Sequence, residues 1–204
     1  MTFSKVRLDE ATHTYTLDGK TYPSVTDICS MLRQSESVPL AVLEYAARRG
    51  TAVHELCELL DYGCETDGIP CEPELVCYVL AYMRFLRDYK PEWELIEYSM
   101  CSPALGYAGT LDRFGRIDGR PVLLDIKTTA SPDRVTRVSW ACQLAGYSFL
   151  LDKDGIRCVD LQLRKDGTYR LIDARETEEK YKFDSRKLFA DLVQIHEITR
   201  GGVK

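Results

Sequence analysis

Hydrophobic residues recur at helical spacing along much of the first half of the chain. In the stretch PELVCYVLAYMRFLRDY, residues 73–89, apolar side chains fall three or four positions apart, which predicts an amphipathic helix. Residues 39–49 also have helical composition. Gly50 then predicts a helix end, and Thr51 predicts the cap of a further helix over 52–62.

Other stretches alternate between apolar and polar residues, as strands do. Residues 13–25 predict a hairpin that turns at Asp18-Gly19, and residues 93–100 predict a single strand. Residues 107–129 and 156–173 predict two more hairpins, each with an Asp-Gly turn near its middle.

Helical segments separate and follow these strands. Ser24 could cap a short helix with Asp27 in its first turn. Residues 131–151 predict a helix opened by a Ser-Pro start, and a last helix is expected over about 176–199.

The order of these elements predicts an α/β or α+β core behind an N-terminal helical region. A length of 204 residues suits one domain. We therefore expect a single domain over 1–204, with a hairpin and helical part in 1–90 and the core in 91–204.

Composition and charge narrow the class of protein. Hydrophobic residues make up 45% of the chain, enough for a substantial core. No apolar run approaches the roughly 18 residues of a membrane helix, and the N-terminus lacks the apolar centre of a signal peptide, so we expect a cytoplasmic protein with no membrane partner. A net charge of −5 argues against bulk attraction to DNA but does not exclude a nucleic-acid enzyme.

The eight cysteines are expected to be free thiols in a reducing compartment. Cys57, Cys64 and Cys71 recur every seven residues and Cys77 follows, but the chain contains no CxxC pair. Small buried side chains are the favoured interpretation, and a metal cluster is the alternative.

The stretch GTLDRFGRIDGRPVLLDIKTT, residues 109–129, places charged side chains inside apolar strands. If the loop consists of Asp118-Gly119 alone, continuing the pairing brings Asp112 directly opposite Asp125, with the two Cβ atoms about 5 Å apart. Lys127 lies two residues after Asp125 and shares its face. A longer loop would break this register, and Pro121 leaves that alternative open.

Two carboxylates this close repel each other unless one takes up a proton or a cation lies between them. Carboxylate oxygens suit Mg²⁺ or Mn²⁺ as ligands. The alternative is a surface salt-bridge patch around Lys127, although the flanking apolar residues argue against full exposure.

An ordered set of motifs resembles the PD-(D/E)XK nuclease superfamily, in particular its RecB-like branch with phage-type exonucleases. The set comprises RGTAVHELCE at 49–58, GTLD at 109–112, DIKT at 125–128 and QLAGY at 143–147. The opening YTLDGKTYPSVTDI is also similar to the N-termini of such exonucleases. The family's proline before Asp112 is absent. The resemblance implies a restriction-endonuclease-like mixed central sheet flanked by helices.

The resemblance also implies roles at the site. Asp112 and Asp125 would hold one or two Mg²⁺ or Mn²⁺ ions, with the backbone carbonyl of Ile126 as a further ligand. His54 would be an additional ligand; as a lone histidine it would more often belong to the core or the surface. Lys127 would position or help deprotonate the attacking water and offset charge at the phosphate.

Further residues are expected to support the site. Glu97 matches the position of another acidic residue in the family, and Glu94 is the competing choice, although alternation places it on the other face. Gln143 and Tyr147 lie four apart on one helix face and would support the site or contact DNA. The remaining candidates for phosphate or site contacts are Thr128, Arg134, Arg137, Arg48 and Arg49. A solvated surface is the equal alternative for the four arginines, while Trp93 and Trp140 are expected in the core.

The expected function is a metal-dependent DNA exonuclease acting on single- or double-stranded ends, in phage-type recombination or end processing. A single-strand annealing protein is a candidate partner, in the cytoplasm of a bacterium or a phage-infected host. Alternatives are a structure-specific endonuclease on the same core and a non-catalytic nucleic-acid-binding module. Only Cys158 follows Tyr147, so we expect no iron–sulfur cluster of the kind that some RecB-like relatives carry.

Overall fold

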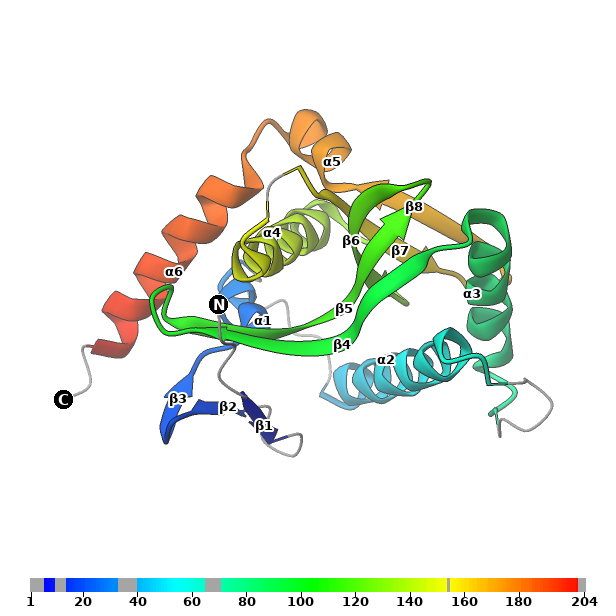
Figure 1. Cartoon of the computed structure of the whole chain (residues 1–204), viewed down its shortest axis with the longest axis horizontal. Coiled ribbons are helices and arrows are strands. Elements are labelled where there is room, and N and C mark those ends of the chain that lie inside the picture. The colour runs from blue at the N-terminus through cyan, green and yellow to red at the C-terminus, as the bar shows by residue number, and fades with distance from the viewer. Residues whose placement is uncertain (1–5, 10–13, 33–39, 65–70, 154, 202–204) are drawn as a thin grey trace.

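A five-stranded mixed sheet forms the centre of the computed structural model (Figure 1). The structure describes residues 6–9, 14–32, 40–64, 71–153 and 155–201. The strands lie side by side in chain order: β4 (Glu92–Ser102), β5 (Tyr107–Ile117), β6 (Arg120–Lys127), β7 (Arg157–Leu163) and β8 (Tyr169–Asp173). β6 and β7 run parallel, and the other neighbours run antiparallel.

Helices cover both faces of this sheet (Figure 1). One face packs against α2 (Leu40–Asp61) and α3 (Val76–Tyr89). The other packs against α1 (Val25–Ser30), α4 (Arg134–Leu151) and α6 (Ser185–Gly201), with α5 (Ala174–Tyr181) beside them. The predicted α+β class, with helices flanking a central sheet, is confirmed.

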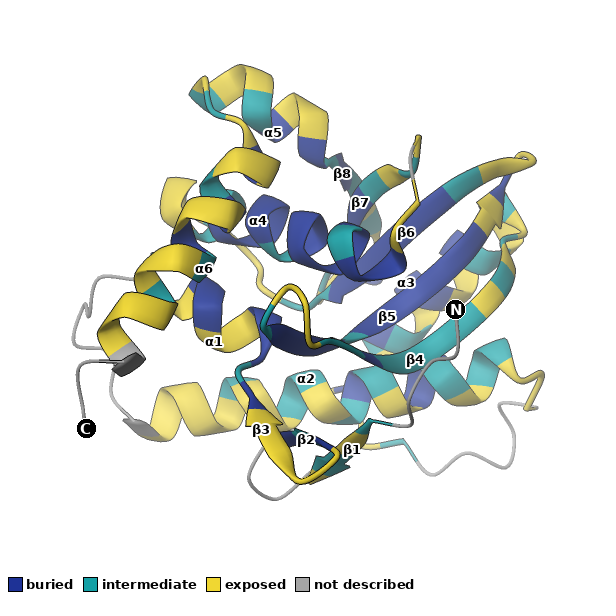
Figure 2. Cartoon of the chain, turned by 60° about the vertical axis from the view of Figure 1, so that its left-hand side comes forward, coloured by how far each residue is buried: buried dark blue, intermediate teal, exposed yellow. Residues whose placement is uncertain are grey.

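The sheet separates two apolar cores, which explains the near-continuous apolar run in β6. Leu123 packs into the core beneath α4, whereas Val122 and Leu124 pack into the core beneath α2 and α3. A strand buried on both faces needs apolar residues at successive positions. Figure 2 shows this burial along β5 and on much of α4, with exposed residues on the outer side of α6.

A smaller three-stranded sheet precedes the main one. It comprises β1 (Arg7–Asp9), β2 (Thr14–Leu17) and β3 (Lys20–Tyr22). The turn at Asp18-Gly19 is confirmed, and β1 was not predicted because three residues carry too little pattern. His13, the predicted start of the hairpin, lies outside the described residues.

The predicted cap of the first helix is confirmed. Ser24 accepts a hydrogen bond from the Asp27 N–H at 2.9 Å, and Asp27 accepts one from the Ser24 N–H at 3.1 Å. This reciprocal pair satisfies two backbone donors at the start of α1.

The predicted helix boundary at Gly50 and Thr51 is wrong. α2 continues through both residues, and the Thr51 hydroxyl donates to the Ala47 carbonyl at 3.3 Å instead of capping a new helix. A glycine inside a helix costs only about 1 kcal/mol, which packing of the helix against its neighbours can offset.

Two other helix predictions also need correction. Asp133, not the Ser-Pro pair before it, caps α4 by accepting from the Thr136 N–H at 2.7 Å. The expected last helix is two helices, because Lys182 adopts a left-handed conformation with φ 56° and ends α5.

The cysteines divide by exposure. Cys57 is buried, as expected for a small core side chain, but Cys64 is exposed and both Cys71 and Cys77 are half-buried. No helix in the described part of the chain is long and apolar enough to cross a membrane.

Candidate metal centre

The β5–β6 hairpin has the register that the sequence predicts. Pairing runs from Ile117–Arg120 to Arg113–Leu124 around a two-residue turn. Both turn residues have positive φ, 51° at Asp118 and 70° at Gly119, as a type I′ turn requires. The regular ladder ends one position before Asp112 and Asp125.

Asp112 enters the space between the strands at this point. Its Oδ2 accepts a 2.6 Å hydrogen bond from the backbone N–H of Ile126. Asp112 and Asp125 are both almost fully buried. Burial and the neighbouring Asp125 carboxylate raise the pKa of Asp112 to about 7.

His54 on α2 lies against two carboxylates. Its Nδ1 is 3.5 Å from Glu97 Oε1 and 3.6 Å from Asp112 Oδ2. One ligand atom from each of the three residues lies within 4.8 Å of the other two. The structure therefore brings together three of the predicted ligand residues, from a helix and two strands.

The second ring nitrogen of His54 fixes the direction of the imidazole. His54 Nε2 is 3.1 Å from the Ile126 carbonyl oxygen. Nε2 donates to this carbonyl, so Nδ1 faces the two carboxylates. The Ile126 carbonyl thus contacts the histidine, and its predicted role as a metal ligand stays a prediction.

The charges around His54 favour its protonated form. Burial lowers its pKa, but Asp112 and Glu97 more than offset this and raise it to about 9. For Glu97, burial alone would raise the pKa, but the positive charges of His54 and Arg113 outweigh burial and bring the pKa below its usual value. An imidazolium thus partly neutralises the two carboxylates.

Glu97 has an unusual backbone for a strand residue. Its φ is 43°. Of the described non-glycine residues with positive φ, Glu97 alone lies within a strand. The flanking pairs Ile96–Arg113 and Tyr98–Leu111 place it opposite Asp112. Such a conformation costs on the order of 1–3 kcal/mol and persists where surrounding contacts hold it.

The competing Glu94 lies elsewhere. The β4–β5 register shifts at this residue, and its carboxylate pairs with Arg116 at 3.3 Å and with Lys153 at 3.9 Å. Glu97, not Glu94, joins the cluster.

Lys127 and Asp125 form an ion pair beside this cluster. The Lys127 ammonium also donates to Gln143 Oε1 at 2.7 Å and lies 5.7 Å from the centroid of the Trp140 ring. Burial opposes the charged form of Lys127, but Asp125 and Asp160 raise its pKa above the usual value. The lysine is therefore held as a cation.

The predicted pair on α4 supports Lys127 from the other side. Gln143 Nε2 donates to Thr26 Oγ1 at 3.1 Å and to the Tyr147 hydroxyl at 3.5 Å. The Tyr147 ring packs so closely on Gly109 that a Cβ there would lie 2.8 Å from a ring carbon. The GTLD and QLAGY motifs are thus in direct contact.

Other predicted residues are less closely tied to the cluster. Arg137 is half-buried, and its positive charge partly offsets the rise in the pKa of Asp160 that burial causes. Thr128 is half-buried just after β6. Arg134 lies over the Tyr181 ring, and Arg49 lies between two tyrosine rings, those of Tyr45 and Tyr78. Arg48 is exposed.

The predictions for the two tryptophans differ in outcome. Trp140 is buried in the core as expected. Trp93 is half-buried and packs against the core beneath α2 and α3, and its indole N–H donates to Asp61 Oδ1 at 3.0 Å.

Asp160 on β7 is a buried acid that the sequence analysis missed. It pairs with Asp125 in the parallel β6–β7 ladder, and Gln162 pairs with Lys127 in the same way. Its Oδ1 is buried without a hydrogen-bond partner, and burial raises its pKa well above the usual value. The similarity of LDIK and VDLQ at equivalent spacing within apolar strands was the available signal.

Arg113 and Asp61 are further missed residues, and both side chains are fully buried. Arg113 Nε donates to Asp61 Oδ2 at 2.5 Å. Arg113 Nη1 donates to Glu97 Oε1 and to the Asp112 carbonyl, each at 2.8 Å. Asp61 follows His54 by seven residues, so both lie on one face of α2.

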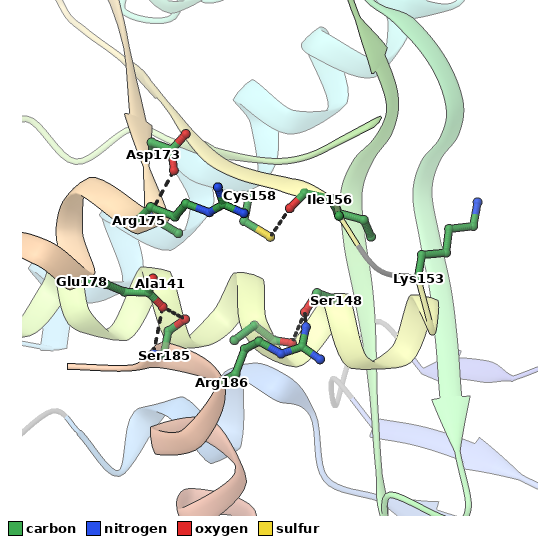
Figure 3. Close-up of a pocket in the computed structure, with 13 residues that line it drawn as sticks. Ala141, Ser148, Lys153, Ile156, Cys158, Asp173, Arg175, Glu178, Ser185 and Arg186 are labelled. Atoms are coloured by element: carbon green, nitrogen blue, oxygen red, sulfur yellow. Dashed lines mark hydrogen bonds between the residues drawn. The ribbon is translucent and has the colours of Figure 1, made fainter. Parts of the chain in front are cut away.

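A cavity of about 270 Å³ lies between α4, α5, α6 and β7 (Figure 3). Arg175 and Arg186 stand on different walls, and Ser148 accepts a hydrogen bond from Arg186 Nη1 at 3.0 Å. Its lining comprises none of the candidate ligands and neither Lys127 nor Gln143. This cavity is therefore separate from the candidate metal centre.

Comparison with known proteins adds little to this geometry. No family model matches the chain, and no curated protein matches it. Among solved structures, a similarity is found with the crystal structure of SSO0001, which is 14% identical, with a TM-score of 0.33 over 80% of this chain and 84% of that one. The functional argument therefore rests on the motifs and the arrangement of the residues themselves.

Proposed function

We propose that this protein is a metal-dependent phosphodiester hydrolase that acts on DNA ends as an exonuclease. The single observation that carries the proposal is the meeting of His54, Glu97 and Asp112 beside the Asp125–Lys127 ion pair. The motifs that contain His54, Asp112, Asp125 and Lys127 resemble those of RecB-like nucleases.

The donor set suits a divalent cation. Glu97 and Asp112 offer carboxylate oxygens, and His54 Nδ1 offers an imidazole nitrogen within 4.8 Å of both. Carboxylates suit Mg²⁺ and Mn²⁺, and the imidazole shifts the preference toward Mn²⁺. When bound, such an ion would supply Lewis acidity and lower the pKa of a coordinated water.

Lys127 would act through its positive charge. Its pKa is raised, and Asp125 and Gln143 hold the ammonium in place. These contacts favour a lysine that orients the attacking water and stabilises negative charge on the phosphate, over one that deprotonates water. Gln143 would fix the ammonium without adding charge.

Asp125 and Asp112 would keep the reacting region electronegative and hold the cation that the reaction needs. Both are buried at the point where the β5–β6 ladder ends, so water has limited access to their carboxylates. In such surroundings each charge acts over a lower effective dielectric than in solution.

The test is a digestion panel with the purified chain, Mn²⁺ or Mg²⁺, and DNA labelled at the 5′ or 3′ end. Linear DNA should be degraded, and Lys127→Ala should reduce the rate by at least about 100-fold, the usual loss for one transition-state donor. Lys187→Ala, at an exposed lysine on α6, is the matched control. Equal rates for the Lys127→Ala variant and the wild type would refute the proposal.

Closed circular DNA separates the exonuclease from the endonuclease alternative. An exonuclease leaves it intact, whereas an endonuclease nicks it. Binding of DNA without cleavage in the presence of either metal would instead support the non-catalytic alternative.

A further inference from the structure

Arg113 is a buried cation that contacts Glu97, a candidate metal ligand. Its side chain has no exposed surface, and its Nη1 donates to Glu97 Oε1 at 2.8 Å. The same Glu97 oxygen lies 3.5 Å from His54 Nδ1. Glu97 is therefore held between an arginine on one side and a histidine on the other.

Asp61 holds the arginine in turn. It accepts from Arg113 Nε at 2.5 Å, from the Tyr82 hydroxyl at 2.8 Å and from the Trp93 indole at 3.0 Å. These three donors come from β5, α3 and β4. The Asp61 carboxylate is thus a fixed anchor at the end of α2.

A buried ion pair of this kind is weak evidence for stability, because desolvation of two charges offsets much of their attraction. Arg113 Nη2 is moreover buried without a hydrogen-bond partner, which adds a cost. The pair does, however, fix a direction, because the planar guanidinium donates to Asp61 and Glu97 through different nitrogens. Its contacts point to orientation of Glu97.

The backbone of Glu97 shows why orientation matters. Its φ of 43° is strained for a residue with a side chain, and such a conformation persists only where surrounding contacts hold it. The hydrogen bond from Arg113 is one of those contacts. In metal sites, partners that hydrogen-bond a ligating carboxylate typically affect metal affinity 10- to 100-fold.

We infer that Arg113, anchored by Asp61, is a positioning residue that holds Glu97 in a metal-binding orientation before any metal arrives. The inference rests on the proposed function, since it assigns a role toward the same centre. It predicts that loss of the Asp61–Arg113 pair weakens metal binding through Glu97 and not through general loosening of the fold.

The experiment measures Mn²⁺ binding to the full chain by calorimetry, with thermal unfolding recorded in chelator. The test variant is the double substitution Asp61→Asn and Arg113→Met, which removes both charges together and leaves neither one buried alone. The matched control is Glu94→Gln with Arg116→Met, which removes an exposed ion pair whose arginine lies on the same strand, β5. The test variant should bind Mn²⁺ 10- to 100-fold more weakly, and the control within twofold of wild type.

A double-mutant cycle with Glu97→Gln distinguishes positioning from a merely structural role. If Arg113 acts through Glu97, removal of the pair should change Mn²⁺ affinity little in the Glu97→Gln background. An equal loss in both backgrounds, or wild-type affinity in the folded pair variant, overturns the inference. Arg113→Lys, which keeps the charge but cannot bridge Asp61 and Glu97, carries the same test if the pair variant fails to fold.

Failure of the proposed function would look different. A wild-type chain that binds no Mn²⁺ and cleaves no DNA refutes both statements at once. A wild-type chain that does both, with an unaffected pair variant, refutes only the positioning role.

Discussion

The backbone N–H of Ile126 donates a 2.6 Å hydrogen bond to Asp112 Oδ2, where the next rung of the β5–β6 ladder would otherwise form. A side chain thus takes the place of a backbone acceptor between two strands. The Asp112 carboxylate therefore has two roles. It hydrogen-bonds the neighbouring strand, and it is a candidate metal ligand.

These two roles of Asp112 can be separated by substitution. Asp112→Asn keeps an oxygen for the Ile126 N–H and removes the charge, so the variant should fold but lose Mn²⁺ affinity by at least 100-fold. Asp112→Ala should additionally destabilise the fold by about 1–3 kcal/mol, because a buried N–H loses its acceptor. Urea unfolding and calorimetry measure the two effects. Equal stability of the two variants would contradict the structural role of the carboxylate.

His54 should determine which metal is preferred. His54→Gln replaces an imidazole nitrogen by an amide oxygen, which suits Mg²⁺ better than a nitrogen ligand does. The ratio of Mn²⁺ to Mg²⁺ affinity should therefore fall, by about tenfold if one ligand bond accounts for it. His196→Gln, on α6, is the control. An unchanged ratio in the His54 variant would place the nitrogen outside the coordination sphere.

Stability without metal should fall as the pH rises toward 9. The pKa of His54 is raised from 6.5 to about 9 in the folded chain, so its contribution is complete below about pH 6.5 and is lost as the pH rises through 9. The pKa of Asp112 is raised from 3.8 to about 7, which gives a loss of the same sign at lower pH.

Urea unfolding in chelator between pH 6 and pH 9.5 measures this dependence. The His54 side chain is 27% exposed, so we expect a loss on the order of 2 kcal/mol above pH 6.5. His54→Gln should remove most of that slope. A wild type and variant with parallel pH profiles would disprove the assignment to His54.

Gly109 should tolerate no side chain, because the Tyr147 ring and Val25 lie against it. An added Cβ would be 2.8 Å from Tyr147 Cε1 and 3.0 Å from Val25 Cγ2, so Gly109→Ala should destabilise the fold by about 1–3 kcal/mol. The loss should be smaller when Tyr147→Leu provides room. Gly50→Ala is the control: nothing lies within 4 Å of its Cβ position inside α2, so it should stabilise by up to about 1 kcal/mol.

The sequence predicts those parts of the fold that depend on local patterns. The Asp118-Gly119 turn fixes the hairpin register because a type I′ turn allows only one pairing of the flanking strands. The cap at Ser24 follows from the same kind of short-range chemistry. Gly50 failed as a helix end, since tertiary packing decides whether a helix continues past one glycine.

The candidate site was predictable only in part. Spacing and motifs identify His54, Asp112, Asp125 and Lys127. The Asp61–Arg113 pair was not found, because two charged residues 52 positions apart give no local sign that they meet. Asp160 was missed because a parallel neighbour arrives through a crossover, so no turn reveals its register.

The placement of β7 beside β6 also has a consequence for the order of events during synthesis. β5 precedes β6 in the chain, so one edge of β6 can pair as soon as it is made, whereas the other edge has no partner until α4 and β7 follow. The newborn strand carrying Asp125 and Lys127 then has neither its support from Gln143 nor its partner strand. A chain interrupted before β7 would thus leave one edge of β6 unpaired and would lack Asp160, the buried neighbour of Asp125 in the parallel ladder.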